Sequence, residues 1–199
     1  FITDVELYYS GADVVSFAYN YENVRLNKGE IRRKDIVYNY RYAGGDVTIY
    51  KMTGKQLKDY MEWAADYFDT IQPGDTEYRY NSERAGRKYV TFDIFGGVKY
   101  KIDLRNEKGN KITNLMLVNG KKITSEMELK VGMNAYRFEQ LARKGGIFDG
   151  QEILVLWASK EAIGEIDGTI QNMMIDYIRN VKNGVIEGKS HNNWEIIGL

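Results

Sequence analysis

The chain has 199 residues, 43% of them hydrophobic, which is enough to bury one compact core or two small ones. Its 28 basic and 28 acidic residues balance, so the chain lacks the positive field that draws proteins to nucleic-acid polymers or anionic membranes. No apolar run approaches the roughly 20 residues that cross a bilayer. We therefore expect a single domain over residues 1–199, with no membrane span and no nucleic-acid polymer as a partner.

The chain is poor in the residues that carry most catalytic and metal chemistry. Cysteine is absent, which removes disulfides, thiolate nucleophiles and zinc–thiolate sites together. The single histidine, His191, lies in a polar tail beside Asn192 and Asn193. One histidine cannot build a binuclear metal centre, and it argues against a Ser-His-Asp triad. We therefore predict no catalytic residue and no metal ligand in this chain.

The first quarter of the chain predicts two strands. The sequence starts at Phe1, not at Met, and an amphipathic stretch begins almost at once, as if a helix had been cut part-way. We therefore expect this chain to be a piece of a longer protein. Residues 12–19 are mostly apolar and predict a strand, and residues 21–33 form a polar loop. A glycine pair then makes a turn before a second strand over residues 47–52.

The clearest helix begins after this second strand. Thr53 and Gln56 have the spacing of a capping box, in which a hydroxyl and an amide satisfy unpaired backbone groups of the first turn. Apolar side chains then recur on one helix face at Leu57, Tyr60, Met61, Ala64 and Phe68. The pattern predicts a helix over residues 54–68.

The middle of the chain is rich in short alternating segments. We expect strands over residues 89–94, 98–104, 112–118 and 129–134. Gly96 and Gly97, between the first two, allow a hairpin, a bulge or a backbone pressed against a ligand. Asn119-Gly120 is a strong hairpin signal. The pattern favours an antiparallel meander.

The last third adds a loop, a strand and a helix. Residues 137–150 form a polar, glycine-bearing loop, and residues 152–157 predict a buried strand. An amphipathic helix over residues 170–181 has Thr169 at its N-cap and a stop signal at Asn183-Gly184. Because strands cluster among helices, we expect an α+β fold with mixed and antiparallel sheets and flanking helices.

The strongest compositional signal is aromatic. The chain has 16 tyrosines, seven phenylalanines and three tryptophans, and many of the tyrosines fall in loops or at strand ends. There a ring can face a partner while its hydroxyl stays hydrated. This placement indicates a stacking surface.

Five segments resemble signatures of one family. Residues 47–65, with Thr53-Gly-Lys-Gln-Leu at their centre, resemble the strand, turn and helix of the C-terminal domain of the bacterial 5'-nucleotidase family. Four further matches follow in the family's order: Phe95-Gly-Gly-Val-Lys-Tyr, Asn119-Gly-Lys-Lys-Ile, Asn134-Ala-Tyr-Arg and Asn192-Asn-Trp. The resemblance runs from about residue 7 to residue 194 and is strongest to the 2',3'-cyclic-nucleotide 2'-phosphodiesterase/3'-nucleotidase type.

The resemblance implies a division of labour between two domains. In that family the C-terminal domain holds the nucleotide base between two aromatic rings. A separate N-terminal metallophosphoesterase domain of the same chain holds two divalent metal ions. The implied parent hydrolyses 2',3'-cyclic nucleotides and 3'-nucleotides outside the cytoplasm, in the periplasm, in secreted form or attached to the cell wall. The present chain then binds a nucleoside or nucleotide, carries no cofactor of its own and is inactive alone.

The resemblance also implies particular site residues. Tyr136 and Tyr42 occupy the positions of the two base-stacking rings, with Phe95 as a further candidate. The remaining candidates are Arg137, for a phosphate or ribose, Asn134, for orienting the loop or touching the base edge, and Gly97, for close approach of the backbone to a ligand.

Two departures from the family pattern leave alternatives open. In 5'-nucleotidases an arginine-bearing loop holds the substrate, whereas here Asn23 is nearest that arginine's place, which favours the 3'-nucleotidase type over the 5'-nucleotidase/UDP-sugar hydrolase type. Seven residues, 138–144, also precede Gly145-Gly146 and reshape the pocket wall, so the base preference stays open. Two other readings remain: a non-catalytic module that binds a saccharide or protein surface, and a domain that only supports its neighbour.

Overall fold

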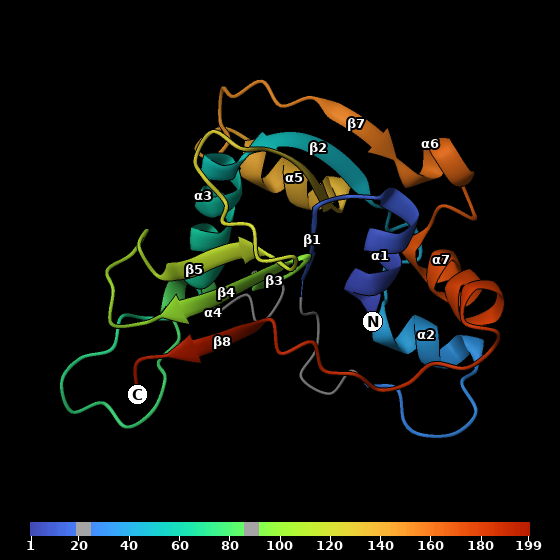
Figure 1. The fold of residues 1–199 in the computed structure, drawn as a ribbon, viewed down its shortest axis with the longest axis horizontal. Helices are drawn as coiled ribbons and strands as arrows, with labels where there is room; N and C mark the ends of the chain where they lie inside the picture. The colour runs from blue at the N-terminus through green and yellow to red at the C-terminus, as the bar shows by residue number, and fades with distance from the viewer. Residues whose placement is uncertain (19–24, 86–91) are drawn as a thin grey trace.

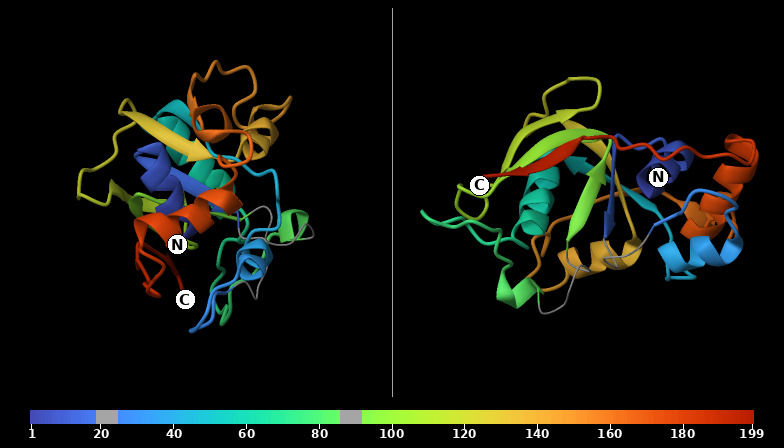
Figure 2. Two further views of the ribbon diagram at one scale, coloured as in Figure 1. Left: turned by 90° about the vertical axis from the view of Figure 1, so that its right-hand side faces the viewer. Right: turned by 90° about the horizontal axis from the view of Figure 1, so that it is seen from below.

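The computed structural model describes residues 1–18, 25–85 and 92–199 of the chain. Asn23 and the first three residues of the strand expected at 89–94 lie outside the described residues. The described residues form two β-sheets with helices around them (Figures 1 and 2). The α+β class with mixed sheets, expected from the sequence, is confirmed.

The larger sheet has five strands and forms the centre of the molecule. In spatial order it consists of β3 (Asp93–Gly96), β1 (Val14–Ala18), β6 (Glu128–Met133), β2 (Thr48–Thr53) and β7 (Val155–Ala158). The pair β1–β6 is parallel and the other pairs are antiparallel. The sheet is therefore mixed, and its central strand β6 comes from late in the chain.

The smaller sheet has three strands and also mixes directions. Its order is β5 (Ile112–Leu117), β4 (Val98–Asp103) and β8 (Trp194–Ile197), with β4–β5 antiparallel and β4–β8 parallel. The expected antiparallel meander is thus only partly present, because β6 pairs with β1 and β2 and not with β5. After the turn at Asn119-Gly120 the chain returns to β5 in a single bridge, Met116 to Lys122, before it leaves for the larger sheet.

Gly96 and Gly97 carry the chain from one sheet to the other. β3 ends at Gly96 in the larger sheet and β4 begins at Val98 in the smaller one, so no hairpin joins them. Gly97 has φ +85, and a Cβ atom there would lie 2.2 Å from the carbonyl oxygen of Asp13. A glycine is required at this position because the chain's own backbone passes against it.

The capping box predicted for the first long helix is confirmed. α3 spans Gly54–Ala65, the Gln56 backbone N–H donates to Thr53 Oγ1 at 3.2 Å, and the Thr53 N–H donates to Gln56 Oε1 at 2.8 Å. Leu57, Tyr60 and Met61 are buried, as the periodicity predicted. The helix ends three residues earlier than predicted.

Three helices gather at one end of the larger sheet, around a second hydrophobic cluster (Figure 1). They are α1 (Ile2–Ser10), α2 (Arg33–Asn39) and α7 (Ile170–Asp176), the last continuing as one π-helical turn over Tyr177–Val181. α3 packs in the main cluster, and the short helices α4 (Ser82–Ala85) and α6 (Ser159–Ile163) lie at the periphery. Met173 and Met174, on the predicted last helix, are buried.

Two segments late in the chain differ from the sequence-based expectation. Where a polar loop was expected from residue 137, the structure has α5 over Ala135–Ala142, with Asn134 as its N-cap. β7, expected as a buried strand, is an exposed edge strand paired on one side only with β2. None of the helices in the described ranges combines the length and apolarity that crossing a membrane requires.

Candidate functional site

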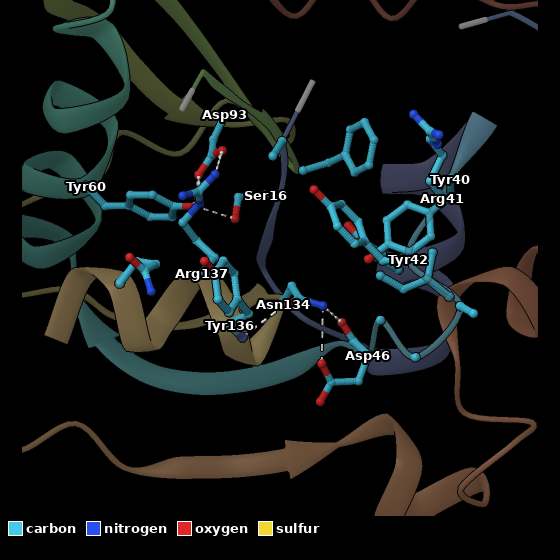
Figure 3. Close-up of a pocket in the computed structure, with 18 residues that line it drawn as sticks. Ser16, Tyr40, Arg41, Tyr42, Asp46, Tyr60, Asp93, Asn134, Tyr136 and Arg137 are labelled. Carbon is cyan, nitrogen blue, oxygen red and sulfur yellow. Dashed lines mark hydrogen bonds and ion pairs between the residues drawn. The ribbon is translucent and has the colours of Figure 1, made fainter. Parts of the chain in front are cut away.

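A cavity of about 850 Å³ opens between the loop that precedes β2 and the start of α5 (Figure 3). Residues 40–46 form one wall, and the first residues of α5 form the other. β1 contributes Ser16, Phe17 and Ala18 to the floor. The cavity therefore lies where segments from the beginning, the first quarter and the last third of the chain meet.

Two exposed tyrosines face this cavity from opposite walls. Tyr42 is 54% exposed and Tyr136 is 66% exposed, and both border the cavity. The ring of Tyr42 packs edge-on against Tyr40, with ring centroids 5.9 Å apart. Figure 3 shows Tyr136 on one side of the space and Tyr40 and Tyr42 on the other. The structure thus brings together the two ring positions that the sequence singled out.

Asn134 joins the two walls. Its side-chain oxygen accepts a hydrogen bond from the Tyr136 N–H at 3.0 Å and so caps α5. Its amide nitrogen donates to the Asp46 carbonyl at 3.2 Å and to Asp46 Oδ1 at 3.3 Å. The same Oδ1 accepts from the Ala135 N–H at 3.4 Å. The helix cap therefore also fixes the loop that carries Tyr42.

Tyr40 forms the back of the loop wall. It is buried, its carbonyl accepts a hydrogen bond from Gln171 Nε2 at 2.6 Å, and a Cβ atom at Gly45 would lie 2.1 Å from its hydroxyl. A glycine at position 45 is needed to leave room for this ring. Burial is the largest cause that raises the pKa of Tyr40, so it remains a neutral phenol.

A buried ion pair closes the α5 side of the floor. Arg137 Nε lies 2.8 Å from Asp93 Oδ2 and its Nη2 donates to Oδ1 at 2.9 Å, with the two side chains 13% and 1% exposed. The Tyr60 hydroxyl donates to the same carboxylate, and Ser16 Oγ lies 2.9 Å from the Tyr60 hydroxyl. Burial lowers and the Asp93 charge raises the pKa of Arg137, and the net shift is upward. The guanidinium of Arg137, which the sequence suggested for a phosphate or ribose, is therefore engaged by Asp93.

The other two sequence candidates do not border the cavity. Phe95 is 3% exposed and packs edge-on against Tyr60 in the main core. Gly97 lies against Asp13, at the crossing between the sheets. Sequence reasoning missed the other residues of the cavity, among them Glu6, Asp46, Tyr60 and Asp93. Only Glu6 gave a usable signal, because it is a charged residue between apolar ones in an amphipathic stretch.

The model of the family described as 5'-nucleotidase, C-terminal domain, matches residues 1–143. The chain belongs to this family. Its elements therefore correspond to the C-terminal domain of 5'-nucleotidases, as the resemblance implied, and the cavity lies between α5 and the loop that precedes the family's strand–turn–helix segment.

Relatives of this family member are nucleotide phosphoesterases. The 2',3'-cyclic-nucleotide 2'-phosphodiesterase/3'-nucleotidase of Haemophilus influenzae is 25% identical over 189 residues, covering 87% of this chain and 27% of the relative. The trifunctional nucleotide phosphoesterase protein YfkN of Bacillus subtilis is 31% identical over 180 residues, covering 84% of this chain and 11% of the relative. The chain thus spans about a quarter of one relative and about a tenth of the other.

A solved structure shares the fold over nearly the whole chain. It is a Staphylococcus aureus protein provisionally described as a 5'-nucleotidase, with a TM-score of 0.78 and 22% identity. The match covers 98% of this chain and 35% of that protein.

The described residues do not fit a two-metal centre. They contain no group of three or more histidine, cysteine, aspartate or glutamate side chains that could hold a metal ion. His191 lies 2.9 Å from Asp4 on α1, at the surface. No step of phosphate-ester chemistry is therefore assigned to these residues.

We expect Arg137→Met to destabilise the fold. Removing one partner of a buried pair leaves the other charge uncompensated, which costs about 3 kcal/mol of unfolding free energy. The loss should stay near this lower value because the Arg84 guanidinium also acts on Asp93. Urea denaturation measures it, with Lys55→Met as control, since that variant breaks a surface pair and should leave stability nearly unchanged. Equal stability of the two variants would contradict the assignment.

We expect Asn134→Ala to loosen the wall as well as the helix. Loss of an N-cap lowers the unfolding free energy by about 1 kcal/mol. Because the amide also holds Asp46, hydrogen exchange across residues 40–46 should accelerate. Thr53→Ala removes the cap of α3 and is the matched control, with a similar stability loss but unchanged exchange in that loop. Identical exchange profiles would show that Asn134 acts only as a cap.

Proposed function

We propose that this domain binds the nucleoside part of a nucleotide in the cavity, with the base between Tyr42 and Tyr136. The observation that supports this is the placement of two exposed tyrosines on opposite walls of one cavity, in a member of the 5'-nucleotidase C-terminal family. A flat base can contact both rings, and such stacking contributes about 1 to 3 kcal/mol per base. Because every base has a π-face, stacking alone gives broad base tolerance.

The proposed parent is a metal-dependent nucleotidase that hydrolyses 2',3'-cyclic nucleotides and 3'-nucleotides outside the cytoplasm. The names of the Haemophilus and Bacillus relatives, and the small share of their length that this chain covers, support a larger hydrolase. In it, an N-terminal metallophosphoesterase domain would hold two divalent metal ions. This domain would hold the nucleoside so that its phosphate reaches them, which is a contribution of positioning.

We expect the chain to bind adenosine and 3'-AMP, and not a monosaccharide. Tyr136→Ala and Tyr42→Ala should each weaken adenosine binding by about 5- to 150-fold, because each removes one stacking ring. Isothermal titration of the 199-residue chain measures the affinities.

Tyr38→Ala is the matched control for these variants. Tyr38 is 59% exposed on the neighbouring helix α2 but does not border the cavity, so its loss should leave the affinity unchanged. Binding of the monosaccharide with indifference to adenosine would favour a saccharide-binding module. Absence of both would leave a domain that only supports its neighbour.

We also expect the purified chain to have no phosphoesterase activity. With 2',3'-cyclic AMP or 3'-AMP and added Mn²⁺ or Zn²⁺, product should stay at background, because the described residues offer no group of ligands for a metal ion. The full-length Haemophilus enzyme serves as the positive control for the assay. Metal-dependent turnover that co-purifies with the folded chain would refute the division of labour.

A further inference from the structure

One buried acid in the cavity has a carboxyl oxygen without a hydrogen-bond partner among the described residues. Glu6, on α1, borders the cavity and is 2% exposed. Its Oε2 atom is buried and makes no hydrogen bond within the described parts of the chain. An unsatisfied buried polar group costs free energy, and an unpaired buried charge costs much more. Packing alone therefore does not explain why a glutamate is buried at position 6.

Burial favours the neutral form of this carboxyl. Burial raises the pKa of Glu6 well above its ordinary value, and the N-terminal ammonium of Phe1 opposes the shift only in part. A neutral carboxyl carries a hydroxyl donor beside a carbonyl acceptor. Glu6 thus presents one donor and one adjacent acceptor at the cavity.

Ionisable groups that border the cavity with Glu6, and Asp176 on the neighbouring α7, have partners of their own. On the loop wall, Asp46 is held by Asn134, and the Asn134 side chain also hydrogen-bonds Tyr40. On α7, Asp176 accepts hydrogen bonds from Tyr9 and Asn180, and on β3, Asp93 is paired with Arg137. These neighbours leave the Glu6 carboxyl to a group that enters from the cavity.

We propose that Glu6 hydrogen-bonds the edge of the bound base. The nucleobases present a donor beside an acceptor on their edges, as adenine does with its amino group and ring nitrogen. A carboxylic acid complements such an edge in two parallel hydrogen bonds. Its proton can sit on either oxygen, so it accepts either order of donor and acceptor. Glu6 would therefore require an edge of this kind without selecting one base, and this inference rests on the proposed function.

Purine riboside separates edge recognition from stacking, because it has the ring system of adenosine without the exocyclic amino group. The wild-type chain should bind adenosine at least about fivefold more tightly than purine riboside, since one hydrogen bond is lost. Glu6→Met keeps the length of the side chain and removes both polar atoms, so it should bind the two nucleosides equally. Glu6→Gln keeps a donor and an acceptor and should retain the preference.

The outcomes distinguish the two proposals. Equal binding of both nucleosides by the wild-type chain would overturn the role of Glu6 and leave stacking intact. Failure to bind either would overturn the proposed function itself. A preference that persists in Glu6→Met would assign edge recognition to another residue and also overturn the inference.

A pH titration tests the same inference should Glu6→Met not fold. Below its raised pKa Glu6 holds its proton and adenosine binding is constant; above it the donor is lost, so affinity should fall up to tenfold per pH unit. Glu6→Gln should show no such decline. His191 pairs with Asp4 on the same helix, so His191→Asn is the control and should keep the decline. An affinity that rises with pH, or a decline that persists in Glu6→Gln, would contradict a protonated Glu6 as the donor.

Discussion

The site depends on the hydrogen bonds that join Asn134 to Tyr136 and to Asp46. A helix begins with backbone N–H groups that have no partner within the helix, and here Asn134 and Asp46 satisfy two of them. Because the asparagine amide also donates to Asp46, the requirement of one helix end fixes a loop 88 residues earlier in the sequence. The hydrogen bonds of Asn134 hold the wall that carries Tyr42 against the wall that carries Tyr136. Contact between the two rings is not needed to hold the walls in place.

The buried floor of the cavity carries little net charge, which suits a nucleoside better than a phosphate. Asp93 and Arg137 neutralise each other, Tyr40 and Tyr60 have raised pKa values and stay uncharged, and burial favours the protonated form of Glu6. An anionic phosphate would gain nothing from these groups in the interior. The uncharged base is the part of a nucleotide that such a floor accommodates, and the phosphate would then face outward, toward the proposed metal domain.

Local signals in the sequence were sufficient for part of this arrangement. Thr53 and Gln56 act within one helical turn, so their capping box could be predicted, and the family pattern placed Tyr42 and Tyr136 at what proves to be one cavity. The pairing of β6 with β1 and β2 is non-local and left no local trace, so a meander was expected instead. α5 was missed because its residues were grouped with Gly145 and Gly146, which follow it, as one polar loop from residue 137. Phe95 and Gly97 serve the core and the sheet crossing, functions that use the same residue types as ligand contact.

The two kinds of contact proposed for the cavity solve different physical problems. Stacking supplies affinity but is nearly indifferent to rotation of the base about the normal to its plane, because the ring face is the same in every rotated position. A nucleoside held by stacking alone would present its ribose, and so its phosphate, in several directions. Hydrogen bonds from a buried donor and acceptor limit that rotation to the positions in which a donor–acceptor edge of the base faces Glu6. In this view Glu6 contributes less to the strength of binding than to the direction in which the ribose leaves the cavity, and that direction is what a metal site in another domain requires.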